Sequence, residues 1–137
     1  MTAPPAAIPA QPRGRSRVLR ISLWIVRGLL ALQFLVGGLT KLVGDPAMVT
    51  MFADMGAGQG LRLLVGACEV AGAIGLVIPP LYRLAACGLV LLMVGATATN
   101  VLFLQISPVP PLLFGALAAV VAVVGLRRRD RQAPRGG

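Results

Sequence analysis

Four polar residues of kinds that can do chemistry stand inside stretches that are otherwise apolar: Arg27, Lys41, Glu69 and Asn100. A carboxylate in apolar surroundings is costly unless a cation pairs with it. Arg27 and Lys41 are both candidates, because residues 14 positions apart lie within about 40° of each other on a helix. The spacing predicts one polar cluster of Lys41, Glu69 and Asn100, with Arg27 as a candidate fourth member. It leaves the partner of Glu69 open.

Three interpretations of this cluster are open. A structural ion pair would fix the register of the helices, while the other polar side chains would bond to their own backbone. A binding site would hold a polar headgroup, a quinone ring or a small anion. The third interpretation is a glutamate that exchanges protons with a transported cation, although a proton relay is difficult to build around one acidic group without a histidine.

The chain contains no histidine, which excludes Ser-His-Asp hydrolysis, HExxH zinc sites and His-ligated haem. We therefore expect no metal and no haem, and the sequence offers no catalytic residue. Whether the chain has an enzyme activity stays open, and we favour the interpretation that it has none by itself. Two cysteines, Cys68 and Cys87, would be offset by about 9 Å if their helices fold back at Pro79–Pro80. This offset exceeds the reach of a disulfide, so both are interpreted as small buried residues.

The elements that must position these residues are four apolar runs. Hydrophobic residues make up 57% of the 137 residues and charged residues 12%, whereas a soluble domain carries about 25% charged residues. The runs cover residues 21–43, 61–78, 82–104 and 109–126. Each can span a hydrocarbon core of about 30 Å as a helix, and lipid requires every backbone group to be bonded internally. The sequence predicts an all-α integral membrane four-helix bundle.

A fifth, shorter helix is expected between the first two runs. Asp45 and Pro46 are typical of a helix N-cap and first helical position. An apolar stripe with helical spacing follows them, at Met48, Met51, Phe52 and Met55. The pattern predicts a short helix near residues 46–55 that lies on the membrane surface or over the bundle.

Small residues recur along the runs. Ala67, Ala71 and Gly75 stand at every fourth position of the second run. Such positions let helices approach closely in lipid, where packing replaces the hydrophobic effect. The pattern predicts a tight bundle, and it equally suits a homo-oligomer.

The basic residues predict the orientation of the chain. The net charge is +9, and arginines gather before the first run and after the last, whereas the loops at residues 44–60 and 105–108 contain no Lys or Arg. The positive-inside rule then predicts that both termini are cytoplasmic. We interpret residues 1–20 and 127–137 as disordered basic tails around a membrane domain of residues 21–126. The arginines are topology signals that also attract anionic lipid, and no nucleic-acid binding is expected.

Two motifs follow one another along the chain: G-x-x-K-L at residues 38–42 and G-x-x-E-x-x-G-x-x-G-L at residues 66–76. With Arg27 before them and Arg83 after them, they resemble the DoxX-like family of small four-helix bacterial membrane proteins, over about residues 27–126. The resemblance implies a four-span bundle in the bacterial plasma membrane. Some relatives are described as membrane subunits of quinone-linked thiosulfate oxidoreductases or as anchors of redox complexes. Relatives often have histidine at the position of Asn100, and asparagine does not titrate near neutral pH.

We therefore expect a non-catalytic membrane subunit or anchor of a quinone-linked redox complex in the bacterial inner membrane. It would bind a quinone or lipid headgroup at the cluster and dock a soluble or peripheral redox partner. One alternative is a small dimeric transporter in which Glu69 binds a cation, although Lys41 and Arg27 would neutralise that charge. The other alternative is a structural or chaperone-like membrane component without a ligand.

Overall fold

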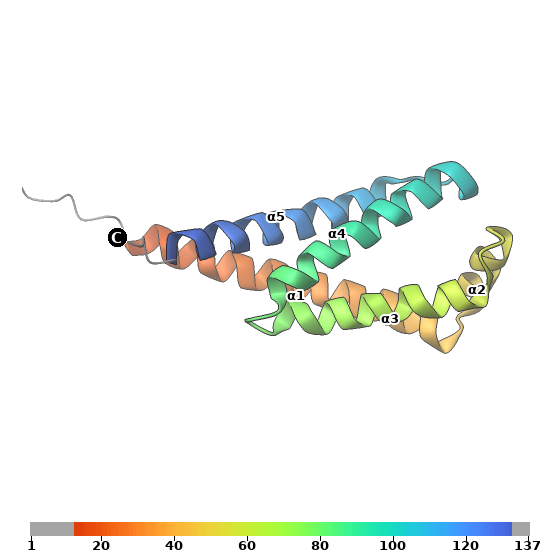
Figure 1. Ribbon diagram of the computed structural model, residues 1–137, viewed down its shortest axis with the longest axis horizontal. Coiled ribbons are helices and arrows are strands. Elements are labelled where there is room, and N and C mark those ends of the chain that lie inside the picture. The colour runs from red at the N-terminus through yellow and green to blue at the C-terminus, as the bar shows by residue number, and fades with distance from the viewer. Residues whose placement is uncertain (1–12, 133–137) are drawn as a thin grey trace, which may run out of the picture.

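The computed structural model describes residues 13–132, and this part of the chain is built of helices (Figure 1). The elements are α1 (Arg13–Val43), α2 (Pro46–Asp54), α3 (Gly58–Val77), α4 (Tyr82–Thr99), the π-helix η1 (Asn100–Leu104) and α5 (Val109–Gln132). Within the described residues, four helices are long and apolar enough to cross a membrane: α1, α3, α4 continued by η1, and α5. For residues 13–132, the prediction of an all-helical protein with four runs that can cross a membrane is confirmed.

The long helices follow the predicted runs, and the first and the last of them extend farther toward the chain termini than predicted. α1 begins at Arg13 and α5 ends at Gln132, whereas the predicted runs begin at residue 21 and end at residue 126. Residues 1–12 and 133–137 of the predicted basic tails lie outside the described residues. The third run, residues 82–104, divides at Asn100, where the helix widens from α to π. Gln105 then takes a left-handed backbone angle, φ 50°, and ends the run.

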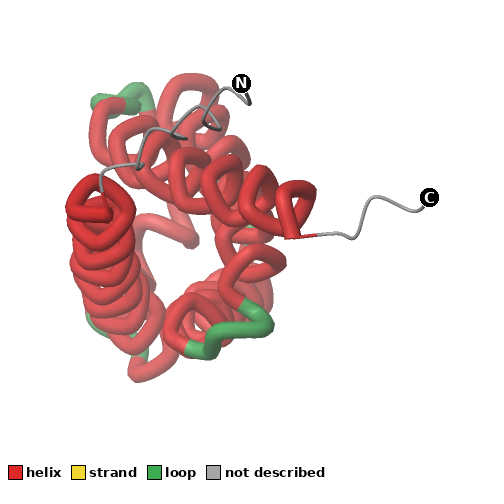
Figure 2. Tube along the Cα trace, turned by 90° about the vertical axis from the view of Figure 1, so that its left-hand side faces the viewer, coloured by secondary structure: helices red, strands yellow, loops and turns green. Residues whose placement is uncertain are grey.

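The long helices form two antiparallel pairs. α1 packs along α3, and α4 packs along α5. Figure 1 shows that the pairs lie together at the end that carries the turn between α3 and α4, and diverge toward the end that carries α2. Figure 2 looks along the bundle and shows the helices arranged around a common axis. The beginning of α1 and the end of α5 lie at the same end of the molecule, as four crossings require.

The core lies where the two pairs come together. Its largest fully buried side chains come one from each long helix: Leu30, Leu76, Leu89 and Val121. Small buried residues of α3, α4 and α5 surround them, which lets the helices approach closely. This end of the bundle is therefore the closely packed end.

α1 and α3 touch at a pair of glycines near the other end. A Cβ atom on Gly38 would stand 2.8 Å from the carbonyl oxygen of Gly66, and one on Gly66 would stand 3.0 Å from the carbonyl oxygen of Gly38. Backbone lies against backbone here, so neither position has room for a side chain. Of the small residues that the sequence pattern singled out, Gly75 makes a close contact, because a Cβ atom on it would stand 2.7 Å from the Cβ atom of Ala85. Ala67 and Ala71 are exposed, so the predicted stripe is wrong at these two positions.

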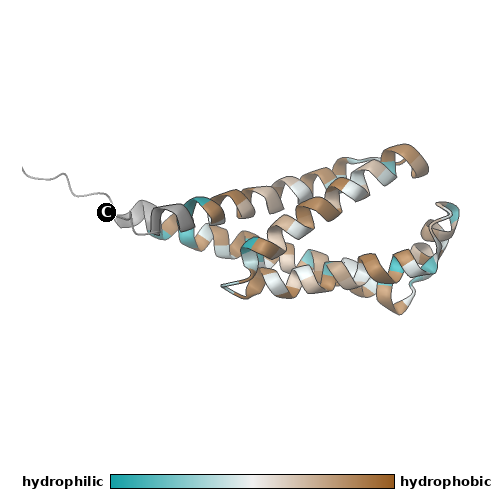
Figure 3. Ribbon diagram, viewed as in Figure 1, coloured by the Kyte–Doolittle hydropathy of each residue, from teal (hydrophilic) through white to brown (hydrophobic). Residues whose placement is uncertain are grey.

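The outer surface of the bundle is apolar. Large hydrophobic side chains on all four long helices are exposed, among them Leu29, Leu64, Leu91 and Leu113. Figure 3 shows hydrophobic colours along most of the length of the bundle. Soluble monomers rarely expose so large a continuous apolar surface to water, and this surface is suited to contact with lipid.

The short helix α2 forms as its capping residues predict. The Asp45 carboxylate accepts a hydrogen bond from the Ala47 backbone N–H at 3.0 Å, and Pro46 occupies the first turn. Gly44, before the cap, has φ +77°, which a residue with a side chain rarely adopts. The reversal between α1 and α2 therefore depends on this glycine. Phe52 is buried on the inner face of α2.

Candidate functional site

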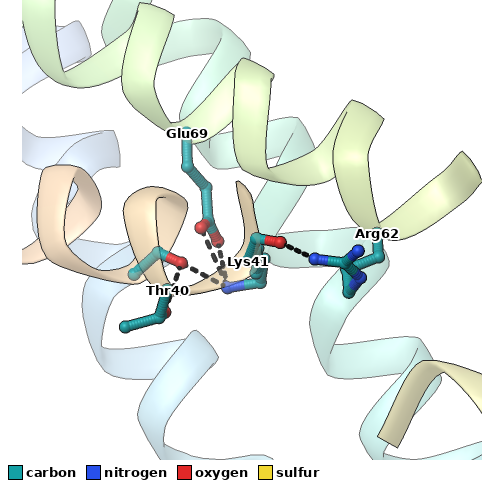
Figure 4. Close-up of polar contacts among 5 residues, drawn as sticks. Thr40, Lys41, Arg62 and Glu69 are labelled. Atoms are coloured by element: carbon teal, nitrogen blue, oxygen red, sulfur yellow. Dashed lines mark hydrogen bonds and ion pairs between the residues drawn. The ribbon is translucent and has the colours of Figure 1, made fainter. Parts of the chain in front are cut away.

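Glu69 pairs with Lys41. The Lys41 ammonium nitrogen lies 2.9 Å from Oε2 and 3.1 Å from Oε1 of Glu69, as Figure 4 shows. The two side chains are only 14% and 7% exposed. Of the two cations that the sequence offered as partners for Glu69, the structure therefore selects Lys41.

The backbone of α1 completes this ion pair. The Lys41 ammonium also donates to the Gly37 carbonyl oxygen at 3.2 Å. A Cβ atom on Gly37 would stand 3.4 Å from Oε2 of Glu69, so the glycine leaves the carboxylate close against the helix. The Gly38–Gly66 contact lies one turn away and holds α1 and α3 close enough for the short bridge. The G-x-x-K and G-x-x-E spacings thus place each charge one turn after the close contact.

The pair forms part of the wall of a cavity of about 620 Å³ between the diverging helix pairs. Residues from α1, α2, α3, α4, η1 and α5 contribute to this wall. The chain has four phenylalanines, and all of them line the cavity: Phe34, Phe52, Phe103 and Phe114. Phe34 and Phe114 meet edge to face with ring centroids 6.3 Å apart. The cavity is thus aromatic and apolar, with one ion pair in its wall.

Asn100 lines the same cavity from η1. Its side-chain amide nitrogen donates to the Ser107 carbonyl oxygen at 3.1 Å, which ties the loop before α5 to η1. Gln33 and Thr99 are the neighbouring polar residues of the wall, and the Thr99 hydroxyl donates to the Gly95 carbonyl oxygen at 2.9 Å. Lys41, Glu69 and Asn100 of the predicted cluster therefore share one cavity.

Arg27, the candidate fourth member, does not join them, and the expected cluster needs this correction. Its guanidinium donates to the Leu76 carbonyl oxygen at 2.8 and 2.6 Å and to that of Val77 at 3.4 Å. The last carbonyls of a helix have no partner within the helix and carry partial negative charge, so they attract a cation. Leu76 is seven residues beyond Glu69, about 10 Å along the helix.

Two aromatic rings hold Arg27 in this position. Its guanidinium carbon lies 4.3 Å from the centroid of the Trp24 ring and 4.1 Å from that of Tyr82. Trp24 precedes Arg27 by three residues, so the two share a helix face, and this spacing is a signal that the sequence carries. The position of Tyr82 depends on the turn between α3 and α4, which only the structure gives.

Arg62 has a role that residue spacing did not reveal. Its guanidinium donates to the backbone carbonyl oxygen of Lys41 and, through Nε, to the Gln59 side chain at 2.6 Å. Figure 4 shows it beside the Lys41–Glu69 pair, bonded to the backbone of α1. It therefore supports the last turn of α1, on which Lys41 is carried.

The cysteines lie apart from this site. Cys68 and Cys87 are both free. Cys68 is exposed on α3, which corrects the expectation that both are buried, while Cys87 is half-buried. Cys68 precedes buried Glu69 by one residue, about 100° around α3, and therefore lies off the buried face of that helix.

Comparison with known proteins identifies a family. The model of the DoxX-like family matches residues 25–125, which include Arg27 and every residue of the cavity wall. No curated protein and no solved structure matches the chain significantly.

Proposed function

The chain belongs to the DoxX-like family, and from that premise we propose that it is a non-catalytic membrane subunit that binds a quinone-type ring. The observation that carries the proposal is the aromatic cavity with the Lys41–Glu69 pair in its wall. The ring would lie among the phenylalanines, and its oxygens would meet the polar groups. As a subunit of a redox complex, the protein would hold this ligand for a soluble or peripheral partner.

The composition of the cavity supports a ring-shaped amphiphile. Sites for small molecules usually measure about 300–1,000 Å³ and combine apolar and aromatic walls with a few placed polar groups. A cavity of about 620 Å³ is large enough for a substituted ring. Flat rings stack on aromatic side chains in offset or edge-to-face arrangements. A simple inorganic anion has no apolar surface to pack against the four phenylalanines of the wall.

The exposure of the wall supports entry from the lipid. Leu91 and Phe103 line the cavity and are also 74% and 68% exposed. The cavity therefore continues onto the outer apolar surface on the side of α4 and η1. A ligand with an apolar tail could place its ring inside and leave its tail among lipid chains.

We further propose the orientation that the charges predict. Arg17 and Arg20 near the start of α1 and Arg127 near the end of α5 would lie on the cytoplasmic side of a bacterial plasma membrane. α2 and the loop at residues 105–108 would lie on the opposite side. α2 would then rest at the membrane surface with Phe52 directed into the bundle.

The test is ligand-induced thermal stabilisation of the purified protein in detergent. A ligand that binds the folded protein at a hundred times its dissociation constant stabilises it by about 2.7 kcal/mol. Short-chain ubiquinone and menaquinone analogues, each in oxidised and reduced form, are the probes. We expect at least one form to raise the unfolding midpoint of the wild-type protein.

Two glycine variants locate the binding. Gly95 lines the cavity and Gly28 lies outside it, and a Cβ atom at either position would have open space. G95F should abolish the stabilisation because the new ring occupies the cavity, while G28F should retain it. Equal stabilisation of wild type and G95F would place the ligand elsewhere. Absence of stabilisation with every form of both probes would contradict the proposed function.

A further inference from the structure

We infer that the cavity selects the reduced, hydroquinone form of its ring ligand over the oxidised quinone. This inference rests on the proposed function and concerns which form of the ligand is preferred. It follows from counting the hydrogen-bond donors and acceptors that the wall presents. The decisive residues are Lys41 and Glu69.

The donors of Lys41 are already in use. An ammonium group has three protons and accepts no hydrogen bond. The Lys41 nitrogen has three acceptors within reach: the two carboxylate oxygens of Glu69 at 2.9 and 3.1 Å and the Gly37 carbonyl oxygen at 3.2 Å. A quinone carbonyl needs a donor, and this cation has each of its protons committed to the protein.

The acceptors of Glu69 are only partly used. An ionised carboxylate offers about four lone-pair sites and donates nothing. Lys41 meets each Glu69 oxygen once, so further lone pairs remain for a group in the cavity. A hydroxyl that donates to a carboxylate makes a short, charge-assisted hydrogen bond, about twice as strong as a neutral one. A quinone carbonyl in the same place would set an oxygen against an oxygen.

The other polar groups of the wall do not reverse this preference. The Thr99 hydroxyl donates its proton to the Gly95 carbonyl oxygen, so toward the cavity it acts as an acceptor. The amides of Gln33 and Asn100 can each donate or accept, and they can serve either form of the ring. Glu69 is therefore the group that discriminates.

The hydroquinone gains one charge-assisted hydrogen bond from its hydroxyl group to Glu69. The quinone makes no such bond and places its carbonyl oxygen against the carboxylate, and this difference sets the size of the preference. Such a difference corresponds to about tenfold to a hundredfold in dissociation constant. For a two-electron couple, each tenfold preference for the reduced form raises the midpoint potential of the bound ring by about 30 mV.

The experiment compares three ligands of similar shape in oxygen-free buffer: trimethylhydroquinone, trimethylquinone, and the dimethyl ether of the hydroquinone. The dimethyl ether keeps the ring and both oxygens but has no hydroxyl proton. Dissociation constants are measured on the full-length protein in lipid nanodiscs. We expect the wild-type protein to bind the hydroquinone at least tenfold more tightly than the other two.

Glu69→Gln tests the assigned residue. The glutamine amide can donate to a quinone carbonyl or accept from a hydroxyl, and Lys41 no longer has a carboxylate as its partner, so the preference for the hydroquinone should be lost. The matched control is Asp54→Asn, which removes an exposed carboxylate that does not line the cavity. That variant should keep the wild-type preference.

The outcomes separate this inference from the function on which it rests. Equal affinity of wild type for all three ligands would overturn the selectivity and leave the ring-binding function standing. Absence of binding of all three would overturn both. If E69Q does not fold, the comparison of hydroquinone with its dimethyl ether on the wild-type protein still decides the point.

Discussion

Arg27 and Arg62 make reciprocal contacts between two antiparallel helices. Arg27, on α1, donates to the last carbonyls of α3, and Arg62, on α3, donates to a carbonyl in the last turn of α1. Both residues are buried. Each helix end therefore receives a cation from the other helix, where its partial charge is negative.

This exchange predicts a loss of stability when either arginine is removed. R27M should lower the free energy of unfolding by about 1.5–3 kcal/mol, because hydrogen bonds between a charged group and buried carbonyls are lost. R62M should behave similarly. The measurement is the unfolding midpoint in detergent, with R20M, which changes an exposed arginine, as the control. A drop in R20M as large as that in R27M would contradict the capping role.

The close contact of α1 and α3 predicts a contrast between two glycines of one helix. G38A places a methyl group 2.8 Å from the Gly66 carbonyl oxygen and should cost about 1–3 kcal/mol of stability. G28A meets nothing within 4 Å and should be neutral or stabilising by up to about 1 kcal/mol. Thermal unfolding of the two variants gives the comparison. Equal midpoints would mean that the helices are farther apart than described.

The Lys41–Glu69 pair predicts that the two charges compensate each other. K41M leaves the Glu69 carboxylate without its cation and should cost about 3–5 kcal/mol. The double variant K41M/E69L removes both charges and should be closer to wild type than K41M is, because apolar residues replace a buried pair at little cost. Unfolding of the two variants and the wild type tests this. If the double variant is less stable than K41M, the pair does not act as a unit.

The proposed orientation predicts which residues a membrane-impermeant maleimide can reach in intact cells. In a variant without native cysteines, C68A/C87A, a cysteine at exposed Thr50 of α2 should react from outside. A cysteine at exposed Arg20 should react only after the membrane is permeabilised. Gel-shift labelling distinguishes the two. Labelling of R20C in intact cells would reverse the orientation.

Much of the fold could be predicted from the sequence because lipid leaves few choices. Apolar runs of spanning length must be helices, and short connections make neighbours antiparallel. The cap at Asp45 follows a local rule that a sequence displays. The stripe of small residues did not identify the α1–α3 contact, which lies at Gly38 and Gly66, because Ala67 and Ala71 are exposed. The widening of the helix at Asn100 does not follow from such a rule and was not predicted.

The site was only partly predictable for a different reason. A helical wheel places Arg27 and Lys41 on one face, but it does not say which acceptors compete for each of them. Arg27 donates its hydrogen bonds to the backbone carbonyl oxygens of Leu76 and Val77 at the end of α3. Lys41 is therefore the cation that pairs with Glu69. The cavity was not predicted either, because its four phenylalanines come from four separate elements. They line a common space only because the two helix pairs diverge at this end of the bundle.

Because the helix pairs diverge, the two ends of the bundle differ in structure. Leu30, Leu76, Leu89 and Val121 close the bundle at one end, while the cavity occupies the other. Substitutions at the closed end would act on folding, and substitutions at the open end would act on the ring binding that we propose for the cavity. The walls of the cavity can therefore be changed without disturbing the closely packed residues that keep the two helix pairs together.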